Sequence, residues 1–130
     1  MAGLIIFEGG HVWGPAKWVY KNLLKTASKY LDVKKNSILI EYISNQEKIA
    51  TYTIDFKELN DEDQNALKKS ILKAVDEINF MDGEDWAKPE FFLGFRNYSN
   101  AIKEMILEIE KYGEVKYESK PKSVFRINNN

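Results

Sequence analysis

The stretch LIIFEGGHVWGPAKWVYKNLLKTASKYL, residues 4–31, places a short apolar run directly before a segment with helical periodicity. The apolar run Leu4–Phe7 is followed by two glycines after one glutamate, as expected of a buried strand that ends in a turn. A glycine and a proline then mark the start of a helix, and apolar residues recur beyond them at intervals of three and four. We predict a strand over Leu4–Phe7 and a helix from Gly14 to near Asp32.

The next two apolar segments are rich in β-branched and aromatic residues. They are Ser37–Ile43 (SILIEYI) and Lys48–Asp55 (KIATYTID), and a polar, turn-prone tetrapeptide separates them. This pattern predicts two strands that pair as an antiparallel hairpin.

Two further helices are expected in the second half of the chain. Asn60 is a good N-cap, and three acidic residues follow it where the helix dipole favours negative charge. Apolar residues at helical spacing then predict a helix over Asp61–Asn79. The same spacing predicts a last helix over Tyr98–Tyr112, because Gly113 is placed to end it in a left-handed cap.

The C-terminal residues complete the expected fold. Glu114–Glu118 alternates as an edge strand does, Ser123–Ile127 is predicted to be a final short strand, and Asn128–Asn130 is expected to fray. The predicted order is β-α-β-β-α-α-β-β, which indicates an α+β fold. We expect a two-layer sandwich, with a mostly antiparallel sheet of four or five strands and about three helices on one face. Without a linker or repeat, residues 1–130 are expected to form a single domain.

Composition excludes several classes of protein. The chain contains no cysteine, which rules out disulfides and thiolate zinc sites and fits a reducing compartment. No apolar run approaches the ~20 residues that cross a bilayer. The start, MAGLIIFEGG, has no basic region before its apolar run, so it is not the pattern of a signal peptide. We expect a cytoplasmic protein without a membrane partner.

Acidic residues are concentrated in one part of the chain. Residues 55–90 carry eleven acids and five lysines, a net charge of −6, whereas the whole chain has a net charge of −1. Such a field can raise the association rate with a basic partner, mainly at low salt. An alternative is an acidic helix face that only keeps the protein soluble.

The segment Phe80–Tyr98 (FMDGEDWAKPEFFLGFRNY) holds six of the 17 aromatic residues, with acids between them. Its two glycines and its proline predict a loop or irregular structure. We expect Phe91, Phe92 and Phe95 to be mostly buried, because six exposed aromatic rings would form too large an apolar patch for a stable monomer. Trp86 is expected to be partly exposed among carboxylates.

A half-exposed tryptophan ringed by carboxylates is a credible hot spot for a basic protein partner. The expected partner-binding residues belong to the start of the second helix and to the aromatic segment after it. They are Asp61, Glu62, Asp63, Asp82, Glu84, Asp85, Trp86 and Glu90.

The first helix has a basic outer face. Lys17, Lys21, Lys25 and Lys29 repeat every four residues, and Trp18 falls within this ridge by helical angle. An indole beside lysines can stack on a nucleic-acid base or contact a protein. Because the whole chain is slightly acidic and most nucleic-acid binders are strongly basic, we do not expect nucleic acid to be the partner.

His11 is the only histidine, and it lies in the glycine-flanked segment Gly9–Gly14. A catalytic base or an anion pocket is one interpretation, with Glu8 near enough to orient the ring. The segment lacks both the GxGxxG and the GxxxxGK[ST] phosphate-binding patterns. No nucleophile or set of metal ligands accompanies the histidine. We therefore predict no catalytic residue, no cofactor and no metal site.

Two functional hypotheses follow. The first is a small cytosolic protein-binding module, with bacterial immunity proteins and antitoxins as the natural example. Such a protein would neutralise a basic toxin, for instance a nuclease, through an acidic-aromatic surface. The alternative is a small enzyme or ligand-binding domain with a pocket at Gly9–Gly14 that uses His11.

Overall fold

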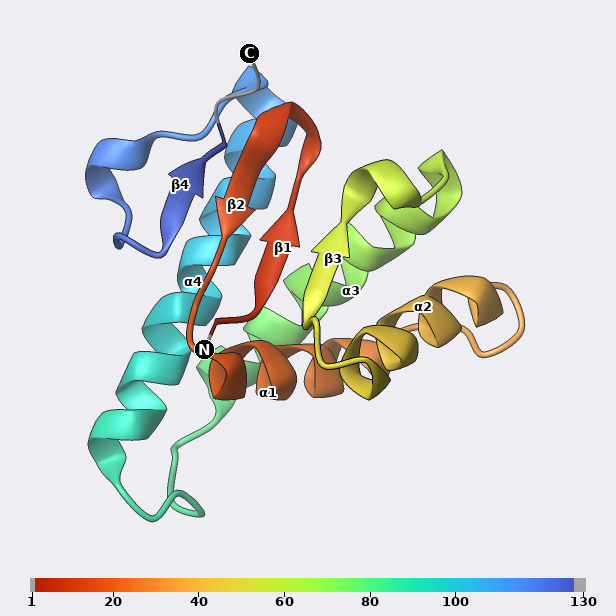
Figure 1. The fold of residues 1–130 in the computed structure, drawn as a ribbon. Helices are drawn as coiled ribbons and strands as arrows, with labels where there is room; N and C mark the ends of the chain where they lie inside the picture. Colours follow the sequence, from red (N-terminus) through yellow and green to blue (C-terminus); the bar gives the residue numbers. More distant parts are fainter. Residues whose placement is uncertain (1, 128–130) are drawn as a thin grey trace.

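The computed structural model describes residues 2–127, and in this range the regular elements follow the order β-β-α-α-β-α-α-β (Figure 1). Short 3₁₀ turns follow β1 and β3 and precede β4. The elements are β1 (Leu4–Ile6), β2 (His11–Trp13), α1 (Lys17–Ser28), α2 (Ser37–Lys48), β3 (Thr53–Asp55), α3 (Asp61–Phe80), α4 (Pro89–Tyr112) and β4 (Val124–Arg126).

The four strands form one mixed sheet in the order β3-β1-β2-β4. β1 pairs in parallel with β3, where Ile5 lies opposite Ile54, and antiparallel with β2, where Ile5 lies opposite Trp13. β2 pairs antiparallel with β4. Two of the three pairings are thus antiparallel, and the predicted α+β class is confirmed with a mixed sheet.

The helices pack on the sheet and on one another around a common hydrophobic core. α3 packs against both α1 and α4, and Figure 1 shows α3 and α4 behind the strands with α1 crossing below them. Fully buried side chains come from both layers, including Ile5 and Trp13 of the sheet, Tyr20 of α1, Ile71 of α3 and Ile106 of α4. Within residues 2–127, none of the helices has the length and hydrophobicity to cross a membrane.

The predicted hairpin is wrong, because residues 37–48 form helix α2. The carboxylate of Asp32 accepts hydrogen bonds from two backbone N–H groups and shapes the turn that precedes this helix. Leu39 and Ile43, four residues apart, are buried, whereas Ile38 is 74% exposed. The apolar residues therefore follow a helical spacing, and packing overrides the β propensity of their side chains. Only Thr53–Asp55 of the second predicted strand is a strand.

The predicted start of the last helix, Tyr98, is also wrong. α4 begins at Pro89, nine residues before Tyr98, so much of the expected loop is helical. Pro89 occupies the first turn, where its missing N–H costs nothing, and Gly94 lies within the helix. Gly113 ends α4 with a φ of 73°, as predicted.

The structure differs from the predicted order of elements in three smaller respects. His11–Trp13 is strand β2 rather than a loop, because it pairs with strands on both sides. The segment 114–118 is not a strand, and its last two residues belong to the 3₁₀ turn Tyr117–Ser119. The first helix begins at Lys17 rather than Gly14. The expected frayed end, 128–130, lies outside the described residues.

Two predictions of position are confirmed. α3 spans Asp61–Phe80, and the side chain of Asn60 caps it by accepting a hydrogen bond from the Asp63 N–H at 2.8 Å. The final strand is Val124–Arg126, inside the predicted range.

Two glycines, one within α4 and one directly after it, test where this helix begins and ends. An added Cβ at Gly94 meets nothing within 4 Å, so Gly94→Ala should stabilise the protein by about 0.5–1 kcal/mol through helix propensity. Gly113→Ala should destabilise it by about 1 kcal/mol, because its backbone is left-handed. Urea denaturation of both variants measures the two effects. Loss of stability in Gly94→Ala would contradict a helix that starts at Pro89.

Candidate functional site

The structure separates the predicted partner-binding residues into two groups. Asp61, Glu62 and Asp63 lie at the start of α3, whereas residues 82–90 follow its other end. A 20-residue helix is about 30 Å long, so the two groups do not form one continuous patch. Asp63 is also 7% exposed and is therefore unavailable to a partner. The acidic-aromatic surface reduces to the segment after α3 and the start of α4.

An aromatic cluster lies where the loop after α3 and the start of α4 meet α1. It consists of Trp18 from α1, Trp86 from the loop, and Phe91, Phe92 and Phe95 from α4. The Trp86 ring stacks on Phe95 with centroids 5.4 Å apart and meets Phe92 edge-on at 5.5 Å. The Trp18 ring lies 6.2 Å from Trp86 and 6.0 Å from Phe91. These contacts join α1, the loop and α4, which are distant in sequence.

The cluster is buried on one side and exposed on the other. Phe92 and Phe95 are 4% and 2% exposed and Trp86 is half-buried, as predicted. Phe91 is 49% exposed, contrary to the prediction. Because residues 91 and 92 belong to one helix, their side chains diverge by about 100°, and only one of them can face the core. Trp18 is 39% exposed.

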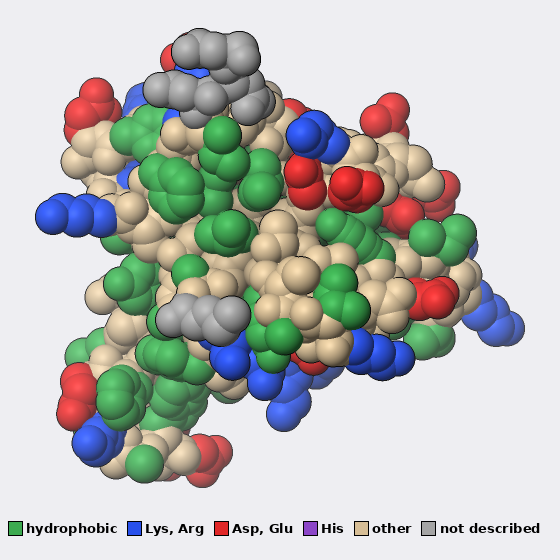
Figure 2. Space-filling model, in the orientation of Figure 1, with side chains coloured by type: hydrophobic (Ala, Val, Ile, Leu, Met, Phe, Trp, Pro, Cys, Tyr) green, Lys and Arg blue, Asp and Glu red, His purple; other side chains and the backbone are tan. Residues whose placement is uncertain are grey.

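Further apolar side chains are exposed in the segments that flank the cluster in sequence. Leu93, next to Phe92 in α4, is 55% exposed, and Phe80, the last residue of α3, is 92% exposed. In Figure 2, hydrophobic side chains gather at the lower left, over the start of α4, with acidic side chains beside them. Exposed apolar groups that are concentrated in this way are typical of interaction surfaces.

Four exposed carboxylates lie on the same segment, those of Asp82, Glu84, Asp85 and Glu90. Asp82 accepts a hydrogen bond from the Glu84 N–H at 2.9 Å, which fixes the turn. Among residues 2–127, none of the four carboxylates takes part in an ion pair. All four carboxylates therefore face solvent, although Lys88 and Arg96 lie in the same part of the chain.

The surface is hollowed on both sides of Trp86. A cavity of about 310 Å³ is lined by Trp18, Trp86, Ala87, Lys88 and Phe91. A second cavity, of about 400 Å³, is lined by Asp82, Gly83, Glu84, Trp86, Pro89, Phe92, Leu93 and Arg96. The first is almost wholly apolar and the second is rimmed by charges of both signs.

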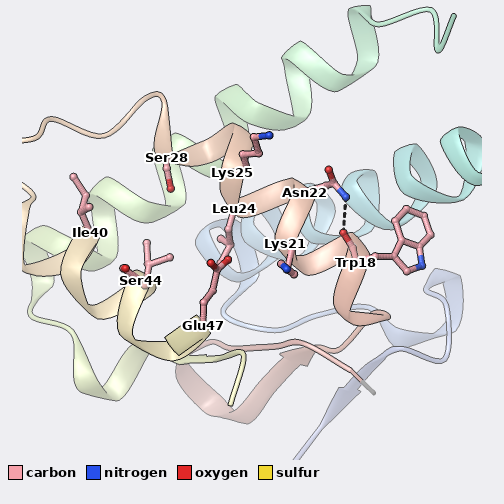
Figure 3. A pocket seen from close by; sticks show the side chains of 10 residues that line it. Trp18, Lys21, Asn22, Leu24, Lys25, Ser28, Ile40, Ser44 and Glu47 are labelled. Carbon is pink, nitrogen blue, oxygen red and sulfur yellow. Dashed lines mark hydrogen bonds between the residues drawn. The ribbon is translucent and has the colours of Figure 1, made fainter. Parts of the chain in front are cut away.

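A groove of about 520 Å³ runs between α1 and α2, on the other side of Trp18 (Figure 3). Lys21 and Lys25 line it from α1, and Glu47 lines it from α2. The Asn22 side chain donates a hydrogen bond to the Trp18 carbonyl at 2.8 Å. Trp18 thus borders both this basic groove and the apolar cavity of the aromatic cluster.

His11 is packed inside the fold rather than in a cavity. It is 3% exposed in β2, and its Nδ1 is hydrogen-bonded to the hydroxyl of Tyr117. Burial, assisted by the positive charge of Arg126, lowers the pKa of the imidazole. Arg126 also donates to the Gly9 carbonyl at 3.1 Å, and β4 pairs with β2, so β4 lies alongside the segment Gly9–Gly14. None of the cavities described here is lined by His11.

Within residues 2–127 Glu8 does not orient the His11 ring through a hydrogen bond, although its charge acts on the ring. Its carboxylate forms an ion pair at 2.9 Å with Lys68, an α3 lysine whose side chain is 9% exposed. Over the described range, no group of three histidine or acidic side chains is placed to hold a metal ion. The side chain of His11 joins β2 to the 3₁₀ turn Tyr117–Ser119, and its backbone pairs with β4.

Comparisons with known proteins give a partial likeness. No family model matches the chain, and no solved structure matches it. Over 105 residues the chain is 28% identical to the chromosomal replication initiator protein DnaA of Corynebacterium aurimucosum, an alignment that covers 77% of this chain and 18% of that protein. The DnaA protein of Mycobacteroides abscessus is also 28% identical over 105 residues, which cover 77% of this chain and 21% of that protein. The chain spans about a fifth of the length of these relatives.

Two phenylalanines of the cluster should respond differently to truncation. Phe95→Ala removes a buried ring that touches both tryptophans and should cost about 3–5 kcal/mol of stability. Phe91→Ala removes a half-exposed ring and should cost less than about 1 kcal/mol. Chemical denaturation measures both free energies of unfolding. Equal losses would mean that Phe91 is a core residue, as its sequence context suggested.

The single histidine gives a prediction for pH. Because burial lowers the His11 pKa in the fold, the unfolded chain binds the extra proton more readily, and stability falls as the pH drops below about 6.5. The stability advantage of wild type over His11→Gln should therefore shrink between pH 7.5 and pH 5.5, as measured by urea denaturation. An advantage that grows at low pH would show that the folded protein prefers the charged imidazole.

Proposed function

We propose that this chain is a small cytoplasmic protein-binding module that docks a basic protein on its aromatic tip. The aromatic tip consists of Trp18, Trp86 and Phe91, with the carboxylates of Asp82, Glu84, Asp85 and Glu90. One observation carries the proposal: partly exposed aromatic rings and carboxylates without ion pairs lie together at one end of the molecule.

The two kinds of group would have different roles in binding. Exposed aromatic rings above an apolar cavity supply contact area with little loss of side-chain entropy, and such residues are common hot spots. The surrounding carboxylates would attract a basic surface and orient it during encounter. The cavity of about 310 Å³ beside Trp86 is large enough to receive an apolar side chain of the partner.

We propose more specifically that the basic protein partner is a toxin and that the chain acts as a bacterial immunity protein or antitoxin. The small size, the acidic segment and the structural placement of His11 support this proposal. The acidic start of α3 would contribute only through long-range attraction, since it lies about 30 Å from the tip.

The likeness to DnaA supports a different kind of partner. The relatives are named as chromosomal replication initiators, and this favours a partner at the chromosome, nucleic acid included. The likeness to DnaA is at odds with the expectation, drawn from the net charge, that nucleic acid is not a partner. It does not bear on whether the partner is a toxin.

The protein encoded beside this chain in its genome is the partner to test first. Expressed alone, it should arrest growth, and coexpression of this chain should restore growth. A neighbouring protein that is harmless, or a toxic one that this chain neither binds nor neutralises, would contradict the immunity role.

The interface itself is tested by matched pairs of charge-removing variants. Glu84→Gln with Asp85→Asn should lower the association rate with that partner and flatten its salt dependence, since rim charges act mainly on association. The control, Asp61→Asn with Glu62→Gln, removes the same charge at the far end of α3 and should change the rate less. Surface plasmon resonance measures both. A larger effect of the control pair would place the interface at the start of α3.

Hydrophobic docking is tested separately. Phe91→Ala should accelerate dissociation and cost about 2 kcal/mol of binding, the usual scale of a hot spot. Tyr112→Ala removes a similarly exposed aromatic ring at the other end of α4 and serves as the control. Equal dissociation rates for wild type and Phe91→Ala would exclude the aromatic tip as the interface.

A further inference from the structure

We infer that the outer face of α1 is a binding site for single-stranded nucleic acid, with Trp18 as a stacking platform and Lys21 and Lys25 as phosphate contacts. This site adjoins the aromatic tip but uses charges of the opposite sign. It rests on the groove between α1 and α2 and on the apolar cavity at the end of that groove.

The three side chains lie in a row along α1. Positions 18, 21 and 25 are separated by three and four residues, which places them on one face of the helix. The distance along the axis from Trp18 to Lys25 is about 10 Å. In Figure 3 both lysines and the tryptophan project from the same helix that borders the groove.

The two lysines are the available cations of the ridge. Lys29 is paired with Glu77 at 2.7 Å, and Lys17 lies over the Tyr52 ring at 4.9 Å. Within residues 2–127 neither Lys21 nor Lys25 forms an ion pair, although Lys21 lies 6.0 Å from the Tyr52 ring. Two ammonium groups without carboxylate partners beside a groove complement the phosphates of a nucleic-acid backbone.

The aromatic rings around Trp18 favour single-stranded over double-stranded nucleic acid. Trp18 is 39% exposed and shares an apolar cavity with Trp86 and Phe91, and the Lys88 ammonium lies 5.5 Å from the Phe91 ring. An unpaired base can stack on such rings whatever its identity, whereas the bases of a duplex are already stacked. An acidic peptide would use the lysines but has no flat group that needs the tryptophan.

The carboxylates near the site also determine the direction in which a bound nucleic-acid strand would run. Glu84 and Asp85 lie next to Trp86 in the chain and would repel phosphate, so the backbone should run from Trp18 toward Lys25, away from the loop. Glu47, on the opposite wall of the groove, would keep the phosphates on the α1 side. Removal of the loop carboxylates should therefore leave the binding of nucleic acid intact or strengthen it.

The test is fluorescence anisotropy with a labelled 12-nucleotide oligothymidylate at low salt and across a salt series. Trp18→Leu should weaken binding about tenfold. Lys21→Gln with Lys25→Gln should weaken it and lower the slope of log K against log salt by about 1.4, or about 0.7 for each phosphate contact. The control Lys34→Gln with Lys35→Gln removes two exposed lysines from the segment after α1 and should leave both quantities nearly unchanged.

Four results would overturn the inference. They are the absence of oligothymidylate binding at low salt, an equal loss of affinity in the control pair, equal affinity for a duplex of the same length, and equal competition by polyglutamate. The last would assign the groove to an acidic protein. Because the two lysines are on the surface, their variants report on binding even if Trp18→Leu fails to fold.

Discussion

The stacking of Trp86 on Phe95 is the contact on which the proposed binding end of the molecule depends. Residues 82–88 have no regular structure, and the indole anchors this loop between α1 and α4. The close approach of Gly83 to the Phe92 ring supports the same arrangement, because a Cβ at Gly83 would lie 2.6 Å from that ring. With the loop anchored, the backbone that carries its carboxylates is held beside Trp18 and Phe91, and a partner need not order that backbone on binding.

Trp18 marks the boundary between two surfaces of opposite charge. On one side Trp18 lines an apolar cavity with Trp86 and Phe91, and the carboxylates of Asp82 and Glu84, which form no ion pair within residues 2–127, line the next cavity along the loop. On the other side α1 presents Lys21 and Lys25 along its groove with α2. The net charge of −1 conceals this separation, because the opposite charges cancel in the total while they remain apart on the surface. A basic protein and a nucleic-acid strand would therefore approach different faces and compete at the tryptophan.

The sequence predicted an element correctly where its capping residues and apolar spacing indicated the same structure. It failed where contacts between residues distant in sequence determine the structure. Helix α3 was predicted almost to the residue because the Asn60 cap and the apolar spacing indicate the same element. Residues 37–48 fold as a helix because their apolar side chains pack against the core, which local β propensity does not report. Pro89 was interpreted as an interruption although it starts α4. The meeting of Trp18 with Trp86 joins residues 68 positions apart, and no sequence spacing indicates it.

The indole N–H signals of the three tryptophans test the central claim most directly, because one tryptophan lies in the core and two lie at the tip. Trp13 is fully buried and donates to the Tyr98 carbonyl at 2.9 Å. In ¹⁵N-labelled protein titrated with a basic protein that binds it, the Trp86 and Trp18 signals should shift while the Trp13 signal stays in place. A saturated complex in which the Trp86 and Trp18 signals do not move would contradict the account and place the binding surface elsewhere on the molecule.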